Sequence, residues 1–171
     1  MLRFFACVML LLPAFGTRVC AADEPRPTSD TATLVEAIRL LTGQQLYQTY
    51  KNLDSLVEFR FYGIREAGEL TRLINSCVDS AEEAERQLAR VAVMKGLSKE
   101  DTAAIARLRK TAGLLVEQGK SLQTYWDTGV NDHWKKSETA RKAAYAELEA
   151  ILELNPKTGV APPPREPGKK P

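Results

Sequence analysis

The sequence predicts an all-α protein, an up-down antiparallel bundle of about four helices with a short leading helix and a disordered, proline-rich C-terminal tail. Three observations predict this fold class. Residues 31–154 are rich in Ala, Leu, Glu, Lys, Arg and Gln, which favour helix. No proline occurs between Pro27 and Pro156, and apolar residues recur at steps of three and four. We therefore expect one helical bundle domain over residues 31–155.

Residues 1–22 have the layout of a secretory signal peptide. An arginine near the start precedes the mostly apolar run Phe4–Phe15, and small residues end the segment at Ala22. A run of about a dozen apolar residues is shorter than the roughly 20 that span a bilayer, so we favour cleavage over an uncleaved anchor. Lipid attachment at Cys20 fits poorly, because an arginine and a valine precede that cysteine. We expect an exported protein, periplasmic or extracellular, with no membrane span after cleavage.

The charge balance of the expected mature chain excludes one class of partner. Without residues 1–22 the chain has 149 residues, 22 of them basic and 22 acidic. A net charge of zero gives no support to nucleic-acid binding, which needs a basic face. Only Cys77 of the three cysteines remains, so no internal disulfide is expected, and its place on an apolar stripe predicts burial.

Two regular apolar stripes define the longest predicted helices. Each follows alternating steps of three and four residues along a helix of about 30 residues, and each needs a helical partner to cover it. The first stripe is Leu70, Ile74, Cys77, Ala81, Ala84, Leu88 and Val91, and the second is Ile105, Leu108, Ala112, Leu115, Gly119, Leu122 and Trp126.

A turn is predicted between these two helices. Gly96 can adopt the left-handed conformation that ends a helix. Ser98 can cap the next helix, with Asp101 three residues later near the positive end of the helix dipole.

The flanking segments are less regular. A stripe of Leu46, Tyr50, Leu53 and Val57 is out of phase with the one that begins at Leu70, which predicts a break near Gly63. Thr42 and Gln45 can form a capping box, so residues before Thr42 are expected to form the short leading helix, which carries Leu34, Ile38 and Leu41.

A third turn and a last helix complete the predicted bundle. Gly129–Asp132 is the predicted turn, and Asp132 is expected to cap the last helix, which stops at Asn155 before Pro156.

The two ends of the chain are expected to lie outside the bundle. Residues 23–30 are expected to be disordered. Residues 156–171 contain six of the nine prolines and are expected to form a flexible tail rich in Pro and Lys.

The sequence offers no catalytic, cofactor-binding or metal-binding residues, and we expect no enzyme activity and no cofactor. Covalent haem needs two cysteines and a histidine. Non-covalent haem would use His133 and Met94, which the topology places at opposite ends of the bundle. Glu-x-x-His pairs for a di-metal centre do not occur. A Ser-His-Asp triad would depend on His133, which is expected to be exposed in the first turn of its helix.

One group of residues is a candidate recognition surface. Antiparallel topology brings the first and third turns to the same end, where six of the nine aromatic residues after position 22 would gather. They could form a plug that closes the core, or a binding surface that uses the large apolar area of aromatic rings. The six are Phe59, Phe61, Tyr62, Tyr125, Trp126 and Trp134.

A short segment resembles a known family. Leu41-Thr42-Gly43-Gln44-Gln45 is similar to the LTxxQ helix-start pattern of small periplasmic stress chaperones, which are also exported and helical. The match covers five residues, and a second LTxxQ does not occur, since Leu97–Asp101 only approximates it. The resemblance therefore implies a chaperone-like role as one hypothesis and does not assign the chain to that family.

The functional expectation is a non-enzymatic interaction or scaffold module with an unidentified protein partner, and a homodimer is a further expectation. The runner-up is a carrier of a small apolar ligand held between helices. A chaperone-like binder comes third.

Overall fold

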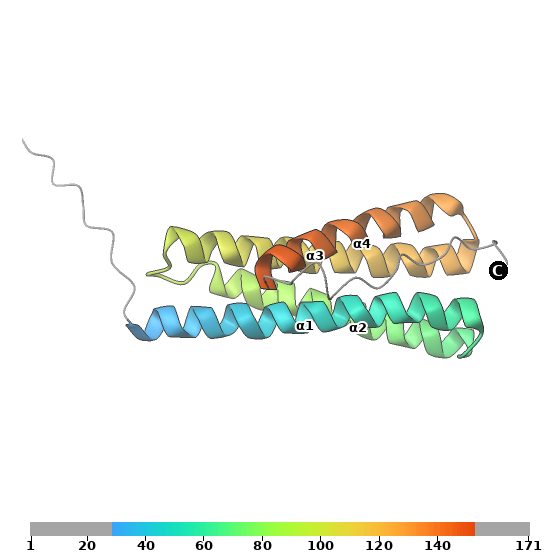
Figure 1. Ribbon diagram of the computed structural model, residues 1–171, viewed down its shortest axis with the longest axis horizontal. Helices are drawn as coiled ribbons and strands as arrows, with labels where there is room; N and C mark the ends of the chain where they lie inside the picture. The colour runs from blue at the N-terminus through green and yellow to red at the C-terminus, as the bar shows by residue number, and fades with distance from the viewer. Residues whose placement is uncertain (1–28, 153–171) are drawn as a thin grey trace, which may run out of the picture.

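A computed structural model of the chain describes residues 29–152, which form four α-helices (Figure 1). They are α1 (Ser29–Tyr62), α2 (Ala67–Val91), α3 (Lys99–Thr128) and α4 (Asn131–Leu152). Successive helices run in opposite directions, and no strand occurs among the described residues. The predicted all-α helical bundle is thus confirmed for this part of the chain.

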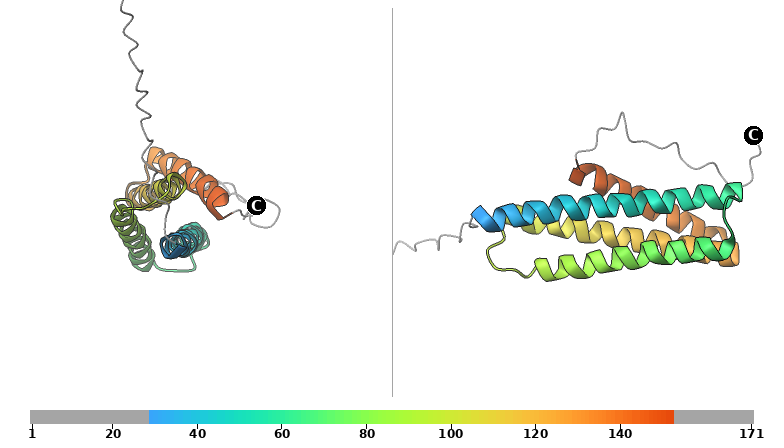
Figure 2. Two further views of the ribbon diagram at one scale, coloured as in Figure 1. Left: turned by 90° about the vertical axis from the view of Figure 1, so that its left-hand side faces the viewer. Right: turned by 90° about the horizontal axis from the view of Figure 1, so that it is seen from below.

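The four helices do not have equal numbers of neighbours. α1 and α3 both contact all of the other helices, whereas α2 and α4 do not touch each other. α4 is inclined to the other three, following α3 at its start and crossing toward α1 at its end (Figures 1 and 2). The core therefore lies between α1, α2 and α3, and α4 covers the side formed by α3 and α1.

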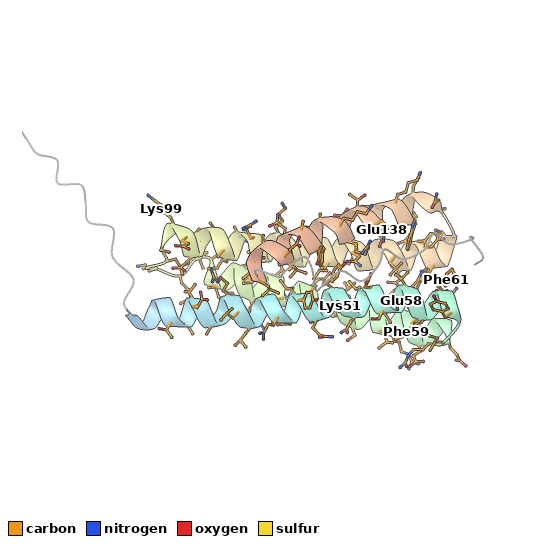
Figure 3. All side chains as sticks on the ribbon, viewed as in Figure 1. Lys51, Glu58, Phe59, Phe61, Lys99 and Glu138 are labelled. Atoms are coloured by element: carbon orange, nitrogen blue, oxygen red, sulfur yellow. The ribbon has the colours of Figure 1, made fainter. Side chains whose placement is uncertain are left out.

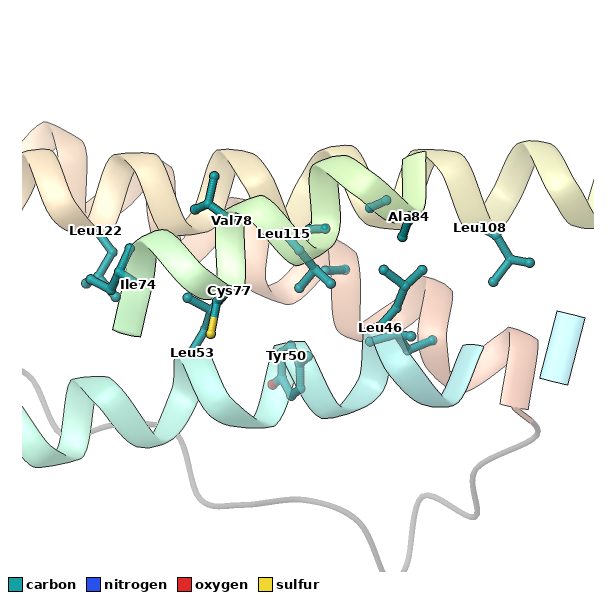
Figure 4. Packing of buried hydrophobic residues seen from close by; sticks show 14 of the residues in the cluster. Leu46, Tyr50, Leu53, Ile74, Cys77, Val78, Ala84, Leu108, Leu115 and Leu122 are labelled. Carbon is teal, nitrogen blue, oxygen red and sulfur yellow. The ribbon is translucent and has the colours of Figure 1, made fainter. Parts of the chain in front are cut away.

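The two long stripes predicted from the sequence form the centre of the core (Figure 4). The α2 stripe from Leu70 to Leu88 is buried, and so is the α3 stripe from Ile105 to Leu122. Val91 and Trp126, the last residue of each stripe, are only partly buried. Cys77 is buried as predicted, because its stripe faces α1 and α3.

A glycine in the second stripe lies at a close contact between α2 and α3. A Cβ atom added at Gly119 would lie 2.5 Å from Cγ2 of Val78 and 3.6 Å from Cδ2 of Leu53. Contacts below about 3 Å are repulsive, so the absent side chain lets the two helices approach and pack closely.

The predicted short leading helix is wrong. Residues Ser29–Tyr62 form one continuous helix, and Thr42 lies in its interior. Gln45 does not close a capping box, since its Nε2 donates to Oγ of Ser80 on α2 at 3.2 Å. Gly43 instead receives the end of α4, with Cδ2 of Leu152 2.9 Å from where its Cβ would lie. Contacts with other helices therefore outweigh a local capping preference of about 1 kcal/mol.

The predicted turn between the two long helices is confirmed, with one difference. Ser98 is the N-cap of α3 and forms a full capping box with Asp101, whose backbone N donates to Oγ of Ser98 at 3.0 Å. Gly96 has a left-handed φ of 84°, but α2 already ends at Val91. Gly96 therefore bends the connecting turn and does not cap α2 itself.

The other two turns also contain left-handed glycines. Gly63 (φ 63°) follows the end of α1, as the break in phase predicted. Gly129 (φ 70°) caps α3 through its backbone N, which donates to the carbonyl oxygen of Tyr125 at 2.8 Å. Asp132 is not the cap of the last helix, because α4 begins one residue earlier, at Asn131.

Several sequence expectations fall outside the described residues. These are the signal peptide at 1–22, nearly all of the segment 23–30, and the tail at 156–171. At the boundaries, α1 begins at Ser29, two residues before the expected domain start, and α4 is described as far as Leu152.

Candidate functional site

The topology brings the first and third turns together, as expected. α1 ends and α2 begins beside the turn between α3 and α4 (Figures 1 and 2). We call this the turn end of the bundle. All six predicted aromatic residues lie there, but the structure divides them into an inner and an outer group.

The inner group packs against the core. Phe59, Trp126 and Trp134 are partly buried and contact the apolar cluster. The ring of Tyr125 lies 5.5 Å from that of Trp134 and so joins α3 to α4. The Arg60 guanidinium lies 5.9 Å from the Trp126 ring, a cation–π contact that joins α1 to α3. These contacts are the ones expected if the inner aromatic side chains form a plug that closes this end of the core.

The outer group projects into solvent. Phe61 and Tyr62 are 48% and 66% exposed, and their rings meet edge to face with centroids 5.1 Å apart. Figure 3 labels Phe61 and Phe59 close together near the end of α1, and of the two only Phe59 packs against the core. Three aliphatic residues that the sequence reasoning did not include are also exposed at this end. We call the full group the outer apolar set: Phe61, Tyr62, Ile64, Leu73 and Val130.

The predicted recognition surface thus remains a prediction and now concerns fewer aromatic residues. Ile64 could have been found from the sequence, because it directly follows Gly63 in a turn, where an aliphatic side chain cannot join a helical stripe. Leu73 could have been found because it lies off the α2 stripe. Phe61 and Tyr62 are exposed and in contact with each other, and exposed apolar side chains in contact are characteristic of interaction sites.

A second arrangement, which the sequence reasoning missed, joins α4 to α1 through buried polar groups. Arg141 donates from Nε and Nη2 to the Glu138 carboxylate at 2.8 and 3.0 Å. Its Nη1 donates to the Tyr50 hydroxyl at 3.2 Å and lies 3.7 Å from Oδ1 of Asp54. We call Tyr50, Asp54, Glu138 and Arg141 the α1–α4 polar cluster.

Two charged side chains of the α1–α4 polar cluster are buried. Arg141 is 9% exposed and Asp54 is 8% exposed. Oδ1 of Asp54 is buried and accepts no hydrogen bond from the described residues. Figure 3 shows Glu138 on α4 level with the stretch of α1 between Lys51 and Glu58. One guanidinium therefore faces two carboxylates where water is largely excluded.

Burial controls the electrostatics of the cluster. Desolvation raises the pKa of the Asp54 carboxyl, and the nearby Arg141 and Lys51 only partly oppose this effect. Desolvation also raises the pKa of the Tyr50 hydroxyl, and the Asp54 charge adds to that rise. Tyr50 is therefore neutral at physiological pH, while Asp54 takes up a proton more readily than an exposed aspartate does.

The residues weighed for catalysis or metal binding lie apart. Met94 is in the turn after α2, and His133 is in the first turn of α4 at the opposite end of the bundle. His133 is partly buried and not exposed as expected. Burial raises the pKa of the Cys77 thiol, which disfavours the reactive thiolate. Within residues 29–152, no three His, Cys, Asp or Glu side chains gather as metal ligands.

Comparison with known proteins gives no relative. No protein family, no curated protein and no solved structure matches the chain. Among the described helices, none combines the length and apolarity needed to cross a membrane.

Proposed function

We propose that this chain is an exported, non-enzymatic interaction module that holds a protein partner at its turn end. The observation that carries the proposal is the outer apolar set, five exposed apolar side chains beside an aromatic plug that fixes the two turns. Exposed aromatic side chains with few rotatable bonds lose little entropy when a partner covers them, which suits them to binding.

Two features of the core count against the carrier of a small apolar ligand. The largest core side chains, such as Leu53, Leu115 and Leu122, are fully buried against one another. α2 and α3 approach so closely at Gly119 that an added methyl group would overlap Val78. A ligand between these helices would have to displace packed side chains, at a cost of about 1–3 kcal/mol for overpacking alone.

The proposal of export is carried by the N-terminal sequence. The charged start, apolar run and small residues of 1–22 give the expected mature N-terminus at Asp23 or Ala22. The intact mass of the protein, expressed with its own leader, measures the cleavage position directly. A mass that retains residues 1–20, or that includes a lipid, would contradict this part of the proposal.

The turn end is tested by photo-crosslinking. A photoreactive amino acid replaces Val130 in the mature protein, which is then irradiated in the exported fraction of the producing cells. We expect a discrete crosslinked adduct whose partner is identified by mass spectrometry. The triple variant Phe61→Ser, Tyr62→Ser, Ile64→Ser should lose this adduct and keep its melting temperature, because the three side chains are exposed.

A matched control lies at the opposite end of the same helix. Leu34, Leu40 and Leu41 of α1 are exposed to a comparable degree, at 50%, 47% and 67%. Their triple replacement by serine also removes three exposed apolar side chains but should leave the adduct intact. Equal adduct yields from both triple variants would refute the turn end as the binding surface.

A further inference from the structure

α4 is held to the bundle differently from the other helices. It follows α3 and crosses α1, and it has no contact with α2. Its fully buried residues are mostly small or polar, with Leu148 the one large apolar side chain among them: Ser137, Ala140, Arg141, Ala144 and Leu148. Four larger apolar side chains of α4 are partly buried against the core: Trp134, Tyr145, Ile151 and Leu152. Alongside these apolar contacts, α4 thus buries a charged side chain, Arg141.

The contact between α4 and α1 combines apolar packing with buried polar groups. The Arg141 guanidinium reaches across to Tyr50 and Asp54, and the Tyr145 ring lies 5.5 Å from the Tyr50 ring. Further along, the α4 end rests on Gly43. Movement of α4 away from α1 would separate Arg141 from Asp54 and return the Asp54 carboxylate to water.

The charges around Asp54 determine how this movement depends on pH. On α1 its neighbours are Tyr50, Lys51 and Glu58, and on α4 they are Glu138 and Arg141. Arg141 is engaged by both oxygens of Glu138, and it approaches Asp54 only at 3.7 Å, beyond hydrogen-bond distance. The buried Asp54 charge is therefore only partly compensated while α4 is docked.

We propose that the α1–α4 polar cluster is an acid-tightened latch, in which ionisation of Asp54 loosens the contact of α4 with α1 and protonation of Asp54 strengthens it. When α4 loosens, it uncovers Tyr50 and Leu148, which are buried in the docked state. The latch is independent of the function proposed for the turn end.

The sign of the effect follows from proton linkage. The docked state binds the Asp54 proton more tightly than the released state, because desolvation raises the pKa of that carboxyl. Docking thus strengthens as the pH falls through the docked pKa, and the gain is complete below the ordinary pKa of an aspartate. The undocking equilibrium changes up to about tenfold for each unit of difference between the two pKa values.

Hydrogen exchange of the mature protein tests the latch. Amide protection of α4 is compared with that of α2 between about pH 8 and about pH 4, after correction for the intrinsic exchange rate. In the wild type, protection of α4 should rise relative to α2 as the pH falls. In Asp54→Asn, which is neutral throughout, the rise should be absent, and the one change expected near pH 4 is a loss of α4 protection as the ion pair of Glu147 with Lys110 weakens.

The matched control is Glu36→Gln, which is also on α1, is exposed to solvent and is not among the charged neighbours of Asp54. It should retain the pH dependence of the wild type. The latch is refuted if Asp54→Asn keeps the rise in α4 protection, since another group would then be responsible. It is equally refuted if Glu36→Gln abolishes that rise, or if α4 and α2 exchange as one unit at every pH.

Discussion

Two glycines of α3 should respond to the same substitution with opposite signs. Gly119 and Gly113 both lie inside the helix, six residues apart. A Cβ at Gly119 would meet Val78 at 2.5 Å, whereas a Cβ at Gly113 would meet no atom within 4 Å. Alanine at either position gains about 0.5–1 kcal/mol of helix propensity, because glycine loses more backbone entropy on folding.

The contacts decide the net magnitude. At Gly113 the propensity gain is unopposed, so Gly113→Ala should raise the free energy of unfolding by about 0.5–1 kcal/mol. At Gly119 the methyl group overpacks the α2–α3 contact, which costs about 1–3 kcal/mol and leaves a net loss of up to about 2.5 kcal/mol. Each kcal/mol shifts the melting temperature of a chain of this size by about 2–4 °C.

Urea unfolding and thermal melting measure both variants directly. Gly119→Ala should regain stability when Val78 is also replaced by alanine, because the smaller side chain makes room for the added methyl group. If Gly119→Ala is stabilised as much as Gly113→Ala, then α2 and α3 do not approach at this point, and the packing derived for the core is wrong.

Three further outcomes follow from the buried groups. The Cys77 thiol should resist a bulky thiol reagent in native buffer and react on unfolding, as followed by absorbance; rapid native labelling would contradict its burial. Arg141→Met should cost about 3–5 kcal/mol in urea unfolding, because it leaves the buried Asp54 carboxylate without its nearest cation, and an unchanged midpoint would contradict that burial. The hydrogen bond from Lys110 holds the pKa of Glu147 below its ordinary value, so the stability from this ion pair is present above that ordinary value and is lost as the pH falls through the lowered pKa. Glu147→Gln should therefore lower the melting temperature at neutral pH but not near about pH 3, and a deficit that persists in acid would show another cause.

The aromatic residues at the turn end show how far topology could be predicted. Antiparallel helices of similar length must bring alternate turns to the same end, so the gathering of Phe59, Phe61 and Trp126 follows from the order of helices alone. Which ring points inward depends on the rotation of each helix about its axis. That rotation separated the partly buried Phe59 from the exposed Phe61, only two residues away.

The α1–α4 polar cluster could be predicted only in part. Tyr50 and Asp54 are spaced as neighbours on one helix face, and Glu138 and Arg141 are spaced as a local ion pair. Such pairs usually lie in solvent, so the sequence favours an exposed interpretation. The contact between Tyr50 and Arg141 joins residues 91 positions apart in the sequence. A pattern of neighbouring residues cannot predict a contact over that separation.

The sequence by itself determined the helical class, the two buried stripes of α2 and α3, and the turns at Gly63, Gly96 and Gly129. These features depend on local periodicity and backbone conformation, which neighbouring residues specify. Only the tertiary structure decided that α1 runs unbroken through Thr42, since the end of α4 on Gly43 and the bond from Gln45 to Ser80 outweigh a local cap. It also decided that Arg141 is buried, because a charged side chain enters a core only where another helix supplies its partners.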